Sequence, residues 1–274
     1  MKTSMTKVSA ALALMAFSSV AMASITTTRH NLGAGGTAGN HVLAGGTTEI
    51  CVFCHTPHGA DSAVIVPLWN RVTTTASFQT YATLGTGTLD ATEASIGSIS
   101  IACLSCHDGT QAMDVVLNAP GFGGNTTSST INDVLGTNVV AGWVDATQMS
   151  LAPLNGEFVY ISTDLRNDHP ISIQYGGGNL TTNAPTGVTK DPDFNAPATG
   201  TWNSKTVWWL DTGVTGIGTK QKSDLPLYTR LMGGADQPFV ECGSCHDPHS
   251  NNTTFLRPAV GNANSTVCLT CHNK

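Results

Sequence analysis

Charged side chains are scarce in this chain of 274 residues. Asp, Glu, Lys and Arg make up 11% of the sequence, against roughly 25% in ordinary globular proteins. The 12 basic and 18 acidic residues give a formal net charge of −6, which excludes the basic footprint that nucleic-acid binding requires. Thr, Ser, Asn and Gly must therefore cover much of the surface. Such a surface favours self-association, and it is equally typical of a low-charge secreted protein.

Long apolar runs are also missing, except near the start. Lys2 and Lys7 precede an apolar stretch at 8–17 and the small residues Ala21-Met22-Ala23, the pattern of a secretory signal peptide covering 1–23. The stretch is too short for a membrane-spanning helix, and there is no Cys for a lipid anchor at the expected cleavage site before Ser24. We therefore expect an exported protein without a transmembrane segment.

No cysteine lies outside four Cys-x-x-Cys-His boxes. This spacing is the attachment signature of c-type haem, in which two thiols add to the porphyrin vinyl groups and the adjacent His becomes the proximal iron ligand. The sequence therefore predicts four covalently bound haem c groups. The boxes are box 1 (Cys51, Cys54, His55), box 2 (Cys103, Cys106, His107), box 3 (Cys242, Cys245, His246) and box 4 (Cys268, Cys271, His272).

Two simpler interpretations use the same cysteines. An exported chain with an even number of cysteines could be held by disulfides, and the two thiol pairs of boxes 3 and 4 could bind zinc in a tetrahedral site. Neither explains why a histidine follows every pair. The haem interpretation is therefore preferred.

An internal repeat selects candidates for the second axial ligand. Box 1 continues as Thr56-Pro57-His58 and box 3 as Asp247-Pro248-His249, while boxes 2 and 4 share the pattern Cys-Leu-x-Cys-His. One further histidine precedes the first box of each half. The four distal candidates are thus His30, His58, His169 and His249; His41 is either exposed or a substitute for His30.

His58 lies only three residues after His55, so both side chains start from the same side of one porphyrin. Because Pro57 prevents a helix that would stack the two rings, we expect His58 to bind a different haem, and His249 likewise. The alternative is a surface histidine after a proline turn. Ligation by two histidines keeps the potential low, whereas Met raises it. Outside the signal peptide, the methionines Met113, Met149 and Met232 do not follow the repeat and are expected to fill gaps in the core.

The expected fold is mostly irregular, with few short helices near the boxes, a few β-hairpins, and stacked haems forming the core. Strands are expected at 142–144, 157–160 and 206–210, and loops at 121–130, 176–178 and 192–200. The glycine-rich stretch 24–50 is expected to be a mobile or extended arm. We expect one elongated domain at 24–274 with pseudo-repeat halves at about 24–110 and 160–274, separated by a haem-free insert.

Seven segments resemble the doubled-box multihaem c-type cytochromes of metal-reducing bacteria, which include tetrahaem nanowire cytochromes. The resemblance is weak across 111–160 and 176–235. It implies two-histidine haems in a continuous stack and a homopolymer joined through end-to-end haem contacts. It also implies one axial His donated between subunits, with His30 or His41 as the natural donor. The segments are His30-Asn31-Leu32, the residues 49–59, Pro67-Leu68-Trp69-Asn70-Arg71, the residues 103–109, Asn167-Asp168-His169-Pro170-Ile171, and boxes 3 and 4.

The leading hypothesis is an electron-transfer protein, not an enzyme. It would act at the cell surface as a polymeric conduit to other redox cytochromes, metal oxides or other external acceptors. A soluble periplasmic carrier is the first alternative, although sparse Lys and Arg argue mildly against docking through charge. A multihaem reductase is the second, but it needs an open iron position, and five candidate ligands for four irons require none to be open.

Overall fold

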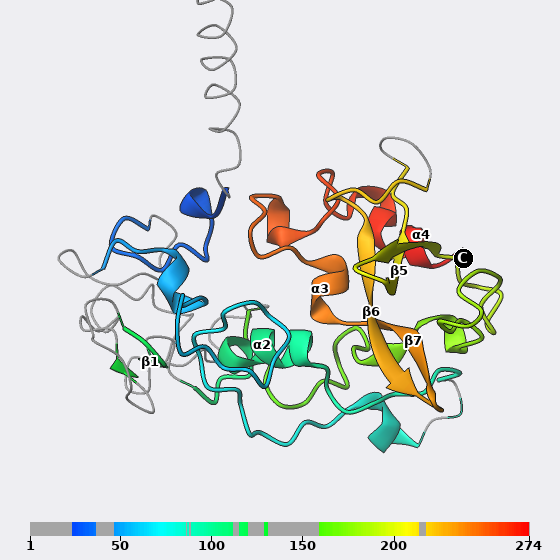
Figure 1. The fold of residues 1–274 in the computed structure, drawn as a ribbon, viewed down its shortest axis with the longest axis horizontal. Coiled ribbons are helices and arrows are strands. Elements are labelled where there is room, and N and C mark those ends of the chain that lie inside the picture. Colours follow the sequence, from blue (N-terminus) through cyan, green and yellow to red (C-terminus); the bar gives the residue numbers. More distant parts are fainter. Residues whose placement is uncertain are drawn as a thin grey trace, which may run out of the picture.

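The structure is a computed structural model that describes residues 24–36, 47–85, 87, 89–111, 115–119, 129–130, 159–213 and 218–273. Most of this chain is loop, with a few short helices and one larger antiparallel sheet (Figure 1). The expected signal peptide, His41, Met113, Met149 and the expected strand at 142–144 lie outside the described residues. In the part that is described, no helix is both long and apolar enough to span a membrane.

Each α-helix of the described chain carries a box. Helix α2 (Ser98–His107) contains box 2, whereas α3 (Cys242–Cys245) and α4 (Thr266–Cys271) contain the cysteines of boxes 3 and 4 and end just before the box histidine. The expectation of short helices near the boxes is therefore confirmed. Box 1 starts instead with a single 3-10 turn, η2 (Cys51–Phe53).

Local sequence explains why the helices stop. Pro248 stands two residues after His246 and disfavours helical backbone at the residue before it, and His246 itself is already extended (φ −108°, ψ 139°). Helix α2 ends at His107 and is followed by Gly109 at φ +75°, a backbone conformation that suits glycine after a helix. The box histidines consequently lie at helix ends, where their rings can leave the helix surface.

The larger sheet has the strand order β3-β7-β6-β5-β4 with antiparallel neighbours throughout. The expected strand at 206–210 is confirmed within β5, and the expected hairpins between boxes 2 and 3 are present. The loop expected at 192–200 is wrong for its last three residues, which begin β4. The strands are β3 (Ile173–Gln174), β4 (Ala198–Trp202), β5 (Lys205–Leu210), β6 (Leu225–Met232) and β7 (Ala235–Val240).

Tight turns set the register of the two hairpins. Asn203 and Ser204 join β4 to β5, and Gly233 and Gly234 join β6 to β7, all four with positive φ. A two-residue hairpin turn of this type needs positive φ at both central positions, which glycine and asparagine tolerate best. The β6–β7 hairpin leads directly into α3 and so fixes where box 3 begins.

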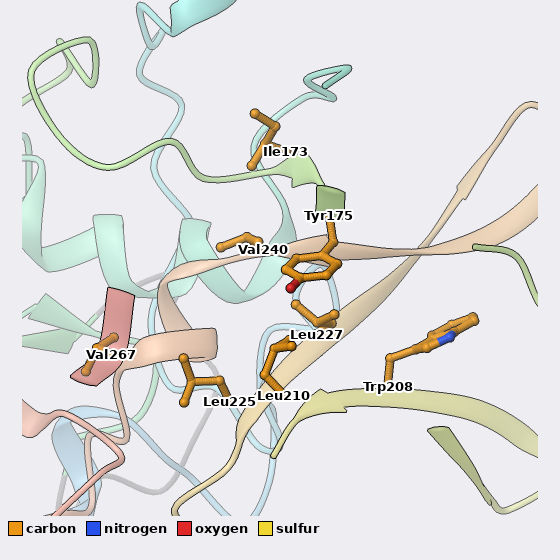
Figure 2. Packing of buried hydrophobic residues seen from close by; sticks show 8 residues of the cluster. All are labelled: Ile173, Tyr175, Trp208, Leu210, Leu225, Leu227, Val240 and Val267. Carbon is orange, nitrogen blue, oxygen red and sulfur yellow. The ribbon is translucent and has the colours of Figure 1, made fainter. Parts of the chain in front are cut away.

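The sheet has a core of side chains of its own, which the sequence analysis did not predict. Trp208 is completely buried on β5, and Val267 of α4 packs into the same cluster, so box 4 is docked on the sheet (Figure 2). The Tyr175 hydroxyl lies 2.7 Å from the carbonyl oxygen of Asn195 and 3.2 Å from that of Cys271. The cluster comprises Ile173, Tyr175, Trp208, Leu210, Leu225, Leu227, Val240 and Val267.

A smaller cluster joins box 1 to box 2. Val64 and Trp69 pack against Ala102 of α2, with Cys54 at the edge of the cluster. Helix α2 in turn packs against α3 near the middle of the molecule (Figure 1). The remaining elements are β1 (Val115–Val116), which pairs with β2 (Ser129–Thr130), and the 3-10 turns η1 (Ser24–Thr27), η3 (Tyr81–Leu84), η5 (Tyr175–Gly177), η6 (Thr253–Phe255) and η7 (Ala263–Ser265).

Residues 24–36 do not form the mobile or extended arm that their glycines suggest. Thr28, Asn31 and Leu32 are buried, and the Asn31 side-chain amide donates to the carbonyl of Thr26 at 2.7 Å. The amide of Ala34 donates to the carbonyl of Thr47 at 2.8 Å. This part of the expected arm is therefore a folded segment, and its residue His30 has a fixed position.

Candidate haem sites

Three of the four box histidines are held in one tautomer by backbone carbonyls. A carbonyl oxygen can only accept, so each Nδ1 must carry the proton and the lone pair is left on Nε2. Metal-binding histidines are commonly oriented in this way. These side chains are therefore prepared to bind iron through Nε2. The contacts are from His55 to Pro67 at 2.7 Å, from His107 to Val159 at 2.7 Å and from His246 to Thr254 at 2.8 Å.

His249 lies opposite the proximal histidine of box 1. The rings of His55 and His249 are nearly parallel, with an interplanar angle of 17° and centroids 6.1 Å apart. Two imidazoles that bind one metal from opposite sides, each with a metal–nitrogen bond of about 2 Å, have centroids roughly 6 Å apart. The structure thus leaves room for one metal ion between these two rings, which come from different boxes.

His30 takes the same place at box 2. Its ring centroid is 6.2 Å from that of His107, with an interplanar angle of 63°. The other neighbours of His30 come from the segment after box 3: Phe255 stacks on its ring at 4.3 Å, and the carbonyl oxygen of Pro248 lies 3.4 Å from Nδ1. Phe255 could not be predicted from the sequence, because no pattern marks an aromatic residue after a box as the neighbour of a candidate ligand.

Burial keeps these imidazoles neutral, as metal ligands must be. It lowers the pKa of His30 to about 4, with a further contribution from His107. Burial likewise lowers the pKa of His107 and of His246, although the carbonyl partner of each ring opposes the shift. At neutral pH these three rings therefore offer a lone pair and carry no charge.

The other two distal candidates, His58 and His169, are exposed, as His249 is. The backbone around His58 is fixed, because its carbonyl accepts from the Thr56 hydroxyl at 3.0 Å and from the Asn118 side chain at 2.9 Å. Nδ1 of His169 donates to the carbonyl of Pro170 at 2.9 Å. Among the described residues, neither ring is brought against a second histidine in the way that His30 and His249 are.

The proximal histidine of box 4 has an aromatic ring close against it. The ring of Phe194 lies 4.3 Å from that of His272, tilted by 50°, and the two residues are also bridged through their backbones. Phe194 itself packs edge-on against Tyr175 of the sheet core. The proximal histidine of box 4 is thus positioned by the sheet rather than by a loop of its own.

Thiols from successive boxes approach one another. Burial and then the neighbouring Cys106 raise the pKa of Cys54 to about 12, which places boxes 1 and 2 side by side. The neighbouring thiol of Cys242 raises the pKa of Cys103, the thiol of Cys103 lowers the pKa of Cys242, and the amide of Cys242 donates to the hydroxyl of Ser100 on α2 at 3.1 Å. Boxes 2 and 3 therefore meet at the first cysteine of each box.

Boxes 3 and 4 meet through their second cysteines. Burial and then the neighbouring Cys245 raise the pKa of Cys271 to about 12. Boxes 1 and 2, boxes 2 and 3, and boxes 3 and 4 are thus neighbours. The four boxes therefore follow one another in space in the same order as in the sequence.

The donor set fits c-type haem. All eight cysteines are free thiols, and within the described residues no three His, Cys, Asp or Glu side chains gather as they would around a bare metal ion. Boxes 1 and 2 each offer two thiols, a proximal imidazole and an opposed imidazole, which are the groups that attach and ligate a haem. Beside box 1, the buried indole N–H of Trp69 has no acceptor among the residues that the structure describes; a haem carboxylate would provide one.

A comparison with known families supports this assignment for the C-terminal part. Residues 237–274, which include boxes 3 and 4, match a family described as the doubled CXXCH motif. No curated protein matches the chain. Over these residues the chain is therefore similar to haem-binding proteins of the cytochrome c type, and its boxes indicate covalently bound haem c and a role in electron transfer.

Proposed function

We propose that the chain is a tetrahaem c-type cytochrome that transfers single electrons along a row of haems, one on each box. The observation that supports this most directly is the ring separation of 6.1 Å between His55 and His249 and of 6.2 Å between His30 and His107. Each pair has the spacing of two axial ligands on one iron. This spacing is found at two different boxes, box 1 and box 2.

The bound haem would supply an iron that alternates between the ferric and ferrous states. The cysteine thiols would attach the haem, and the two imidazoles would hold its iron from both sides and exclude a reactant. With an imidazole on each side, the irons of boxes 1 and 2 have no open position for a substrate. This arrangement favours electron transfer over a multihaem reductase.

The distal ligands connect the two halves of the chain. His249, from the loop after box 3, serves box 1, and His30, which serves box 2, is covered by Phe255 from the segment after box 3. We assign His58 and His169 to the irons of boxes 3 and 4, of the same chain or of a neighbouring copy, and His41 remains the substitute for His30. The order of the boxes in space gives electrons one continuous route from box 1 to box 4.

We further propose that the protein is exported and assembles end to end into a homopolymer that conducts electrons to other redox cytochromes, metal oxides or other external acceptors. Low charge and exposed apolar side chains such as Trp202 and Leu231 support self-association. Because His30 lies against His107 of its own chain, we assign the axial ligand donated between copies to His58, His169 or His41.

Three measurements on the secreted holoprotein test these proposals. Intact mass should show four haems, and carbon monoxide added to the reduced protein should leave its spectrum unchanged. Fewer haems, or a shift caused by bound carbon monoxide in the wild type, would contradict the tetrahaem electron-transfer function. Electron microscopy should show filaments; monodisperse single chains at all concentrations would favour the soluble periplasmic carrier.

A further inference from the structure

A buried acid lies at the junction of boxes 2 and 3. Glu241 follows β7 and caps the start of α3, and it is only 2% exposed. Its Oε2 accepts from the hydroxyl of Ser100 on α2 at 2.5 Å and from that of Ser172 at 2.9 Å. Its Oε1 faces the Arg230 guanidinium at 3.4 Å. One carboxyl group thus connects two box helices and the sheet.

The hydrogen-bond network favours the ionised form of this group. The hydroxyl of Ser100 accepts from the amide of Cys242 at 3.1 Å, and that of Ser172 accepts from the amide of Gly97 at 2.8 Å. Each hydroxyl has one proton, so both protons are directed at Glu241. Burial raises the pKa of Glu241, and the two hydroxyls and the guanidinium oppose that shift. Every partner donates, so the network is built for a carboxylate.

The negative charge is only partly neutralised. Nη1 of Arg230 is closer to the carbonyl of Ser95, at 2.5 Å, than to Glu241, at 3.4 Å, and the arginine is partly exposed. The two hydroxyls on the side of the box helices carry no charge. In a buried environment an incompletely paired charge acts over longer distances than it does in water. Its field therefore reaches the attachment points of both haems.

Those attachment points lie very close to the carboxylate. Glu241 directly precedes Cys242, and Ser100 stands one helical turn before Cys103, whose thiol contacts that of Cys242. Helix α2 also leaves space for the acid: a Cβ at Gly97 would lie 2.0 Å from Oε1 of Glu241. A larger residue at the start of α2 would displace the carboxylate or the helix.

We propose that Glu241 is a positioning residue that holds boxes 2 and 3 together and lowers the reduction potentials of the two haems attached there. This inference rests on the proposed tetrahaem function. A nearby negative charge stabilises the ferric state, which carries one more positive charge than the ferrous state, and net charge around an iron centre is one of the factors that set its potential. With lower reduction potentials, the two central haems would hold an electron less readily than the haems at the two ends of the row.

Two variants that change the local charge in opposite directions distinguish this electrostatic role of Glu241 from a purely structural one. Redox titration of the holoprotein, followed by optical absorbance and resolved into four one-electron steps, is the measurement. Glu241→Gln removes the negative charge and should shift two of the four steps to higher potential. Arg230→Gln removes the compensating positive charge and should shift the same two steps to lower potential. If Glu241→Gln does not fold, the Arg230→Gln result decides alone.

Asp224→Asn is the matched control. Asp224 is also completely buried, and its carboxylate accepts from the amides of Thr212 at 3.0 Å and Gln221 at 2.6 Å rather than from a box helix. The Asp224→Asn variant should leave the potentials of those two redox steps unchanged. Shifts of the same sign in both charge variants, or no shift in Arg230→Gln while intact mass shows four haems, would overturn the inference. A wild type with fewer than four haems would overturn the proposed function instead.

Discussion

His55 and His249 lie opposite each other with ring centroids 6.1 Å apart, although His55 belongs to box 1 and His249 follows box 3 in the sequence. Because Nδ1 of His55 donates to the carbonyl of Pro67, the lone pair of that ring lies on Nε2. The ring opposite His55 thus comes from the other half of the repeat. A haem on box 1 would link two segments that are far apart in the chain.

Replacing His249 by Ala should open one iron. The iron of box 1 would lose its distal ligand, so the reduced variant should bind one carbon monoxide per chain, whereas the wild type binds none. His249→Met is the matched control, because a thioether closes the iron and raises its potential. It should bind no carbon monoxide and shift one of four redox steps upward. An Ala variant that remains closed to carbon monoxide would show that His249 is not a ligand.

His30→Ala should open a second, different iron. His30 lies 6.2 Å from His107, so its loss should allow one carbon monoxide to bind at box 2, and the double variant with His249→Ala should bind two. Added imidazole should close the iron again in His30→Ala, because it can occupy the space that the side chain leaves. Only one carbon monoxide in the double variant would mean that the two histidines serve the same haem.

The sequence predicted the chemistry of the boxes better than their surroundings. Box spacing and the His-x-Pro-His repeat predict the haem attachment points and nominate His249 for a haem other than that of box 3, and the structure places His249 against the proximal histidine of box 1. The partners of the box histidines could not be foreseen, because Pro67, Val159 and Thr254 contribute only backbone carbonyls, which every residue has.

The strands β6 and β7 were missed for a definable reason. Each contains a proline, Pro226 and Pro238, and proline within an apolar run argues against a central strand. The structure accommodates Pro238 because β3 pairs with β7 only at Phe239 and Val240, so that Pro238 needs no partner on that side. Similarly, Pro226 pairs with Trp209 of β5 but lies outside the register with β7.

Two tryptophans of the β4–β5 hairpin provide a matched test of the side-chain core. Trp208 is fully buried and donates from Nε1 to the carbonyl of Pro185 at 2.9 Å, whereas Trp202 is 72% exposed. Trp208→Ala should lower the free energy of unfolding by about 3–5 kcal/mol, and Trp202→Ala should change it by less than about 0.5 kcal/mol. Denaturant titration of the holoproteins measures both. Equal midpoints would contradict the packing seen in Figure 2.

Gly97→Ala tests how closely box 2 fits the buried acid of box 3. The added methyl group would lie 2.0 Å from Oε1 of Glu241, whereas a Cβ at Gly35 meets nothing within 4 Å. Because the interior around Glu241 cannot give way without breaking hydrogen bonds, we expect Gly97→Ala to cost about 1–3 kcal/mol of unfolding free energy. Gly35→Ala, which has the same chemical change and open space, should cost far less. Since the methyl group pushes the carboxylate away from the box helices, the two redox steps assigned to boxes 2 and 3 should also move in Gly97→Ala and stay fixed in Gly35→Ala. Loss of stability without movement of these steps would show that the close fit serves the fold alone.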